Sequence, residues 1–169
     1  MEVQTQGNRI NCPLKDKWQI ATPEELVRQR YICYLVNEYQ YQLEQMGQEI
    51  TVANGHRGQG KARADIVIWR SKEDKQAAKS PLIVVECKAE TVTIREEDYY
   101  QGYNYAAWAG ADFFVTTNQK ETRIFRVVKG HMPKRLERIV DIPKATDNGK
   151  KIKELLAQTK AFTRDEFSK

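Results

Sequence analysis

Two runs of apolar residues in the middle of the chain predict neighbouring β-strands. They are Asp65–Arg70 (DIVIWR) and Leu82–Lys88 (LIVVECK), and a polar segment separates them. Apolar residues follow one another in each run instead of alternating with polar ones, which is typical of strands covered on both faces. The two runs therefore predict central strands of a sheet that has helices on either side.

A helix is predicted ahead of these strands. Thr22 is a suitable N-cap, Pro23 favours the first turn, and Glu25 can complete a capping box. A broad apolar stripe follows, and Gly47 is a plausible end of this helix.

The remaining pattern completes an α/β order within one domain. The further predicted elements are a strand near Glu49–Ala53, a loop at Asn54–Ala62, a helix near Glu96–Ala109, strands at Asp112–Thr117 and Arg123–Val128, and a tail helix at Lys150–Gln158. This order is typical of a mixed central sheet flanked by helices. With 169 residues and no internal repeat, the chain predicts a single domain with its core at about residues 9–142 and a tail at 143–169.

Composition is that of an ordinary globular protein, with 40% hydrophobic and 30% charged residues. The amino terminus has no apolar signal segment, and no apolar run approaches the roughly 20 residues that span a bilayer, so a cytoplasmic location is expected. Cys12, Cys33 and Cys87 show no CxxC spacing, which favours reduced thiols over a disulfide framework or a zinc site.

Charged residues end the two central runs where a strand would favour Val or Ile. Asp65 opens the first run, and Glu86 and Lys88 close the second on one shared face. A hairpin that is symmetric about the point between Lys75 and Gln76 would place Asp65 opposite Glu86. Two carboxylates and a lysine at one sheet end predict a divalent-metal site suited to phosphodiester hydrolysis. The alternative is a structural salt bridge among the three.

A basic, glycine-rich loop precedes the first run. Arg57, Lys61 and Arg63 are candidate contacts for a polyanion, although a solvated basic face is the alternative. Residues 55–62 (GHRGQGKA) satisfy the GxxxxGK spacing of phosphate-binding loops. Ala62, however, stands where Ser or Thr is needed, and the segment precedes a strand instead of following one, so nucleotide binding is not expected.

Short segments spread along the chain form a recognisable set. They are Cys12-Pro13, TPEELVRQR at 22–30, RADIVI at 63–68, VECK at 85–88, QGYNY at 101–105 and FFVTTN at 113–118. Together they resemble the N-terminal nuclease domain of type I restriction endonuclease R (motor) subunits. Asp65, Glu86 and Lys88 match the PD-(D/E)XK signature of the restriction-endonuclease-like superfamily. The motor's P-loop is absent, so we expect a stand-alone relative or an excised domain.

The resemblance implies a restriction-endonuclease-like fold and a metal-dependent DNA endonuclease. Asp65 and Glu86 would bind Mg²⁺ or Mn²⁺, and Lys88 would orient the attacking water or stabilise charge on the phosphate. The implied partners are DNA and the methyltransferase and specificity subunits of a restriction-modification system, in a prokaryotic cytoplasm.

The resemblance also implies roles for three helical residues. Gln101 and Tyr105 share a helix face and match a Gln-x-x-x-Tyr element of RecB-like nucleases, where they would brace the lysine or contact the DNA backbone. Glu25 would supply a third carboxylate from the first helix. The alternatives are packing of a tyrosine-rich helix against the sheet and a capping role for Glu25.

Two other functions stay open. One is a catalytically idle DNA-binding or assembly module of a restriction complex. The other is an RNA or junction nuclease, because a fold does not fix its substrate.

Overall fold

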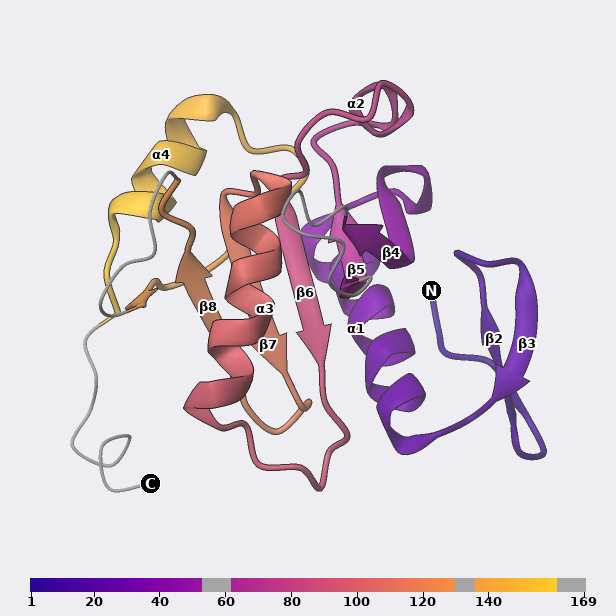
Figure 1. The fold of residues 1–169 in the computed structure, drawn as a ribbon. Helices are drawn as coiled ribbons and strands as arrows, with labels where there is room; N and C mark the ends of the chain where they lie inside the picture. Colours follow the sequence, from indigo (N-terminus) through magenta and orange to yellow (C-terminus); the bar gives the residue numbers. More distant parts are fainter. Residues whose placement is uncertain (53–61, 130–135, 161–169) are drawn as a thin grey trace.

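A six-stranded mixed sheet forms the centre of the computed structural model, which describes residues 1–52, 62–129 and 136–160 (Figure 1). In spatial order its strands are β4 (Met46–Val52), β5 (Ala62–Ile68), β6 (Ile83–Cys87), β7 (Phe113–Thr117), β8 (Thr122–Arg126) and β9 (Glu137–Arg138). Only β6 and β7 run parallel among these neighbours. A parallel pair needs a crossover connection, and the helix α3 (Glu96–Ala109) supplies it.

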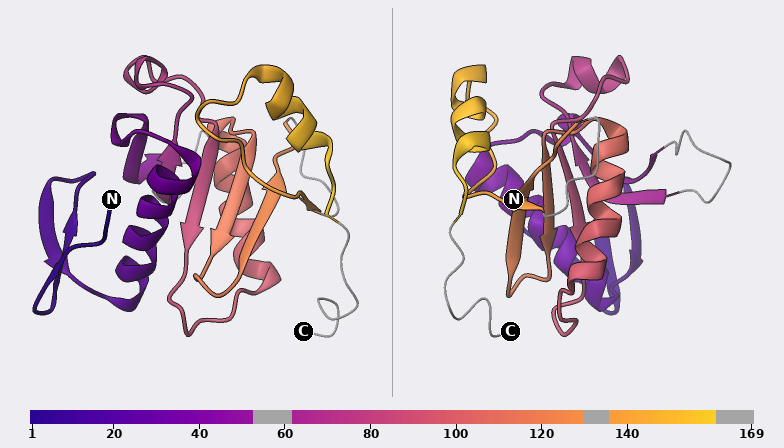
Figure 2. Two further views of the ribbon diagram at one scale, coloured as in Figure 1. Left: turned by 180° about the vertical axis from the view of Figure 1, so that it is seen from behind. Right: turned by 60° about the vertical axis from the view of Figure 1, so that its left-hand side comes forward.

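Helices cover both faces of this sheet. The helix α3 packs on one face, and α1 (Pro23–Tyr39) and α4 (Gly149–Ala157) pack on the other (Figure 2). Each face has its own apolar core, so the expected mixed sheet between helical layers is confirmed. Among the described residues, no helix combines the length and the apolar character needed to cross a bilayer.

The predicted hairpin register of the two central strands is confirmed. Ile66 lies opposite Val85 and Ile68 lies opposite Ile83. All four side chains are 0% exposed, as expected for strands covered on both faces. One further step along this register sets the end of β6 beside Asp65.

The first helix is shorter than predicted. It ends at Tyr39, and Gln40 follows in the left-handed conformation with φ 63°. Gly47, the expected end, lies inside β4, after the short 3₁₀ helix η1 (Leu43–Gln45). Glycine and asparagine usually occupy a left-handed cap, so a glutamine at this position is no sequence signal for a helix end.

Besides η1 and β9, two further parts of the fold were missing from the prediction. The first is an antiparallel sheet of β1 (Thr5–Gln6), β2 (Arg9–Cys12) and β3 (Lys17–Ile20). The second is α2 (Lys72–Gln76), a helix in the polar segment between β5 and β6 that Ser71 caps. Both consist of segments too short for a hydrophobic period to be visible.

The three cysteines are free thiols in buried positions. Burial, reinforced by a hydrogen bond to Glu25, raises the pKa of Cys12 to about 12. Burial likewise raises the pKa values of Cys33 and Cys87. All three therefore remain protonated and behave as small apolar side chains at neutral pH.

Candidate active site

A distortion shared by β4 and β5 decides where Asp65 points. The ladder between these strands skips the pair formed by Glu49 and Asp65, and Glu49 has φ 54°, which costs a non-glycine residue about 1–2 kcal/mol. Ala64 packs with the α3 layer, whereas Ile66 packs with the α1 layer. The alternation of faces therefore breaks at Asp65, which turns toward α1.

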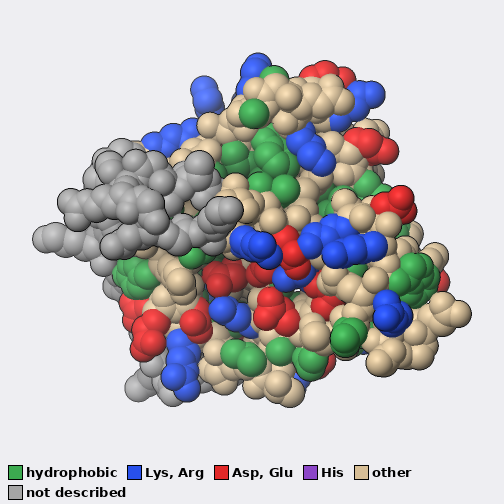
Figure 3. Space-filling model, turned by 45° about the vertical axis from the view of Figure 1, so that its right-hand side comes forward, with side chains coloured by type: hydrophobic (Ala, Val, Ile, Leu, Met, Phe, Trp, Pro, Cys, Tyr) green, Lys and Arg blue, Asp and Glu red, His purple; other side chains and the backbone are tan. Residues whose placement is uncertain are grey.

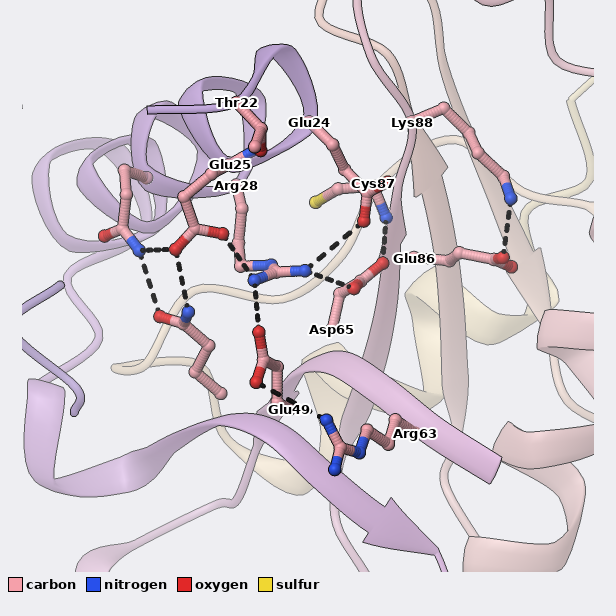
Figure 4. Close-up of polar contacts among 12 residues, drawn as sticks. Thr22, Glu24, Glu25, Arg28, Glu49, Arg63, Asp65, Glu86, Cys87 and Lys88 are labelled. Carbon is pink, nitrogen blue, oxygen red and sulfur yellow. Dashed lines mark hydrogen bonds and ion pairs between the residues drawn. The ribbon is translucent and has the colours of Figure 1, made fainter. Parts of the chain in front are cut away.

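Both oxygens of Asp65 accept a hydrogen bond (Figure 4). Its Oδ1 accepts from the Arg28 guanidinium at 2.8 Å, and its Oδ2 accepts from the backbone N–H of Cys87 at 2.7 Å. The second bond joins the start of the β5 core to the end of β6, next to Glu86. Because each oxygen has a further lone pair, Asp65 keeps some capacity to bind a cation.

Arg28 is the centre of a carboxylate cluster. Its side chain is 7% exposed and forms ion pairs with Glu24, Glu25, Glu49 and Asp65. Burial would lower the pKa of Arg28, but the charges of Asp65 and Glu25 outweigh that effect and raise it. Since a buried charge is tolerated only when it is paired, Arg28 joins α1 to β4 and β5 through these contacts.

Glu25 is enclosed more completely than the other acids of the cluster, with 3% exposure. Its carboxylate accepts hydrogen bonds from the side chains of Cys12, Gln19, Arg28, Gln29 and Gln48. Thr22 caps the helix as predicted, since its Oγ1 accepts from the Glu25 amide at 3.1 Å. The carboxylate itself is turned into the cluster. So many donors on two oxygens favour a structural role for Glu25 over metal binding.

Glu86 faces the opposite helix, α3. Its Oε1 pairs with Lys88 Nζ at 3.1 Å, which confirms that these side chains share a face. Its Oε2 is buried and has no hydrogen-bond partner among the described residues. Burial raises the pKa of Glu86. An orphaned carboxylate oxygen needs a proton or a cation, so this atom fits a bound divalent ion.

Lys88 keeps its charge at neutral pH. Burial would lower the pKa of its ammonium group, but the carboxylate of Glu86 outweighs burial, and Asp98 and Glu24 add to it. The net shift is upward. The ammonium group of Lys88 therefore pairs with Glu86 as a positive charge.

Asp65 and Glu86 form ion pairs with different basic side chains in this structure. Figure 4 shows Asp65 turned to Arg28 and Glu86 extending the other way, to Lys88. Within residues 1–52, 62–129 and 136–160, no group of three or more His, Cys, Asp or Glu side chains is arranged to hold a metal. An ion shared by Asp65 and Glu86 would require one carboxylate to turn.

Three charged residues at the site received no role from the sequence. They are Glu24, Arg28 and Asp98. Glu24 is 49% exposed on its side chain, and burial together with the charge of Asp65 raises its pKa. Glu24 and Arg28 lie in the TPEELVRQR segment that carries the resemblance and stand at i, i+4 spacing, but such pairs are common on solvated helix faces and indicate no role.

Two of the predicted residues, Gln101 and Tyr105, lie on α3. Gln101 is exposed, and Tyr105 packs on Trp108 with ring centroids 5.9 Å apart. Gly102, which follows Gln101, lies against Glu86.

Of the predicted basic contacts, Arg63 is described and is 66% exposed, 3.8 Å from Glu49. Arg57 and Lys61 lie outside the described residues. Figure 3 turns α1 and the amino-terminal sheet toward the viewer, and acidic side chains gather near the middle of that face with lysine and arginine among them.

Comparison with known proteins shows the family to which this chain belongs. Residues 23–143 match the family described as type I restriction enzyme R protein N terminus (HSDR_N). No curated protein matches the chain. Among solved structures, the fragment structure of a chain assigned as an HsdR subunit of a type I restriction enzyme from Vibrio vulnificus YJ016 matches with a TM-score of 0.53 and 19% identity. That match covers 79% of this chain and 25% of the other, so it shows a common fold over a quarter of that fragment. Because the family match extends over more than half of this chain, the chain belongs to the family of type I restriction enzyme R protein N termini.

Proposed function

We propose that this protein is a metal-dependent nuclease that hydrolyses phosphodiester bonds in DNA within a type I restriction system. The observation that carries the proposal is the unsatisfied Oε2 of Glu86, beside Lys88 and one strand away from Asp65. A buried, unpaired carboxylate oxygen next to a second acid is costly in a purely structural site.

Each residue has a definite part in this proposal. Bound Mg²⁺ or Mn²⁺ would neutralise charge at the attacked phosphate and make a bound water more acidic. Once its side chain turns toward Asp65, the carboxylate of Glu86 and a free lone pair of Asp65 would hold that ion. The ammonium group of Lys88 would stabilise the negative charge that develops on the phosphate oxygens. Arg28 would keep Asp65 oriented through its 2.8 Å hydrogen bond.

The family membership supports the restriction context. Methyltransferase and specificity subunits would be the partners that select DNA sites, because this domain offers no separate base-reading module in its sequence. Binding by the domain itself would then be mainly electrostatic and would weaken as salt rises.

A plasmid-nicking assay with Mg²⁺, Mn²⁺ or EDTA tests the proposal. Wild-type protein should nick with either metal and not in EDTA, and Asp65→Asn, Glu86→Gln and Lys88→Ala should each abolish nicking. Asp112→Asn is the matched control, since Asp112 is 16% exposed against 17% for Asp65 and is also ion-paired, at the opposite end of the sheet. Full activity in the Asp65 and Glu86 variants would end the assignment.

One observation favours a second candidate function, an idle DNA-binding or assembly module. Asp65 and Glu86 each already have a cation partner from the chain itself, Arg28 and Lys88. DNA binding without cleavage in any metal would favour this candidate. Comparing duplex DNA, branched DNA and RNA in the same assay would identify an RNA or junction nuclease.

A further inference from the structure

A cavity of about 740 Å³ opens beside the candidate site. The amino-terminal sheet forms one wall through Arg9, Trp18 and Ile20, and the start of α1 forms the other. The cavity extends to Ala89, the residue that follows Lys88. Its size lies within the roughly 300–1,000 Å³ that is usual for ligand sites.

Trp18 and Ile20 are exposed although both are large and apolar. They are 40% and 62% exposed and stand two residues apart on β3, so they share a face. The other face of the same small sheet is well packed, since Ile10 and Cys12 are 0% exposed. Scattered apolar residues on a surface need no explanation, but a pair aligned along one cavity indicates a contact surface.

The charges of the cavity select the kind of ligand. Three carboxylates, those of Glu24, Glu25 and Glu49, line it against two guanidinium groups, those of Arg28 and Arg9. This excess of negative charge repels a phosphate group. A nucleobase is neutral, its amino groups can donate to the half-exposed carboxylate of Glu24, and its ring can stack on the indole of Trp18. Exposed Arg9 stands at the rim, where a phosphate of the same strand could pass.

Building on the proposed nuclease function, we propose that this cavity holds an unpaired base of the substrate strand, stacked on Trp18, next to the phosphate at the candidate site. A base in an intact duplex is already stacked and paired, and it reaches such a pocket only by leaving the helix. The favoured substrate is therefore DNA in which a nucleotide at the cleavage position is unpaired or readily leaves the helix, as in a single strand, a gap or a frayed end.

Tryptophan fluorescence tests this placement directly, in EDTA so that binding is measured without cleavage. In a Trp108→Phe variant, the emission comes from Trp18 and from Trp69, which is 8% exposed. A single-stranded oligonucleotide should quench it. In a Trp18→Phe variant, the exposed reporter is Trp108, which is 47% exposed on α3, away from the cavity, and the oligonucleotide should leave it unquenched.

Affinity gives the second measurement. Trp18→Ala should weaken binding of a single strand and of a gapped duplex by about 5- to 150-fold, the loss of one base–aromatic stack. Trp108→Ala, matched in exposure, should change neither affinity. A blunt duplex should bind more weakly than the gapped one and should respond little to Trp18→Ala. Because Trp18 is exposed, unfolding midpoints should confirm that both variants fold.

The outcomes separate this inference from the nuclease proposal. Equal losses in the Trp18 and Trp108 variants, or equal affinity for gapped and blunt duplexes, would overturn the base pocket even if the wild type nicks plasmid. Self-association that Trp18→Ala abolishes, with DNA binding unchanged, would assign the face to a second copy and overturn it as well. Binding that depends on Trp18, without cleavage of the single strand or the gapped duplex in any metal, would instead overturn the nuclease proposal alone.

Discussion

Gly102 of α3 lies directly against the carboxylate of Glu86. A methyl group at position 102 would meet Glu86 Oε2 and would stand 2.5 Å from Phe114 Cζ, well inside van der Waals contact. Because glycine has no side chain, position 102 leaves room for the carboxylate of Glu86, the candidate metal ligand.

We expect Gly102→Ala to destabilise the fold by about 1–3 kcal/mol, because Phe114 is fully buried and the helix must shift away from it. The same substitution should displace Glu86 and abolish nicking. Urea unfolding measures the first effect. Gly149→Ala is the control, since open space surrounds Gly149 at the start of α4 and its substitution should be tolerated. Unaltered stability in Gly102→Ala would contradict the close approach.

The two adjacent acids of α1 should respond very differently to truncation. Glu25→Ala removes one of the four ion-pair partners of buried Arg28 and leaves several other donors unsatisfied. We expect it to lower the free energy of unfolding by roughly 3–5 kcal/mol. Glu24→Ala removes a half-exposed partner 3.3 Å from Arg28 and should cost about 1 kcal/mol or less. Unfolding titrations measure the free energy of unfolding of both variants. Similar losses would contradict the buried hydrogen-bond network around Glu25.

The pH dependence of stability should reveal the burial of the Glu86 carboxylate. Burial raises its pKa above the ordinary 4.5, so the folded chain holds this proton more tightly than the unfolded chain does. The resulting stability is fully present below about pH 4.5 and is lost as pH rises through the raised pKa. Glu86→Gln lacks this term. Its stability relative to wild type should therefore improve from about pH 4 to about pH 7.

Glu49 supplies the opposite case for the same experiment. The hydrogen bond from Lys15 and the nearby Arg28 lower the pKa of Glu49 below 4.5. Its stabilising contribution is present above about pH 4.5 and is lost as pH falls through the lowered pKa. Glu49→Gln should be less stable than wild type near neutrality, and the deficit should shrink on acidification. Parallel trends for the two Gln variants would contradict both assignments.

Metal binding should be visible without any substrate. If Mg²⁺ or Mn²⁺ binds the folded protein alone, saturation at about 100 times Kd should add about 2.7 kcal/mol of stability. Thermal unfolding with increasing metal measures this shift. Asp65→Asn and Glu86→Gln should remove it, and Asp112→Asn should retain it. A shift that persists in both active-site variants would mean that the ion binds elsewhere.

The central strands could be predicted because their signal is strong. Ile66, Ile68, Ile83 and Val85 form uninterrupted apolar segments, and the symmetric placement of these segments about the polar turn is enough to predict their register. The helix at Glu96–Ala109 was likewise predicted to the residue, since Gly110 marks its end.

The orientation of Asp65 could not be predicted in the same way. Strict alternation places it on the face of Glu86, but the left-handed conformation of Glu49 interrupts that alternation. Glutamate rarely adopts positive φ, so no residue type indicates the break. Arg28 lies in the TPEELVRQR segment that carries the resemblance, but the sequence assigns it no role, because its four acidic partners come together only in the fold.

The guanidinium at the heart of the carboxylate cluster has a consequence for how the domain is made. Arginine cannot release its proton at any physiological pH, so these acids have a permanent internal counter-ion from the moment the chain folds. We therefore expect the domain to fold without a metal, in contrast with small zinc domains that stay unfolded until the ion binds. Magnesium would then bind a domain that is already folded, and its release would leave the fold intact.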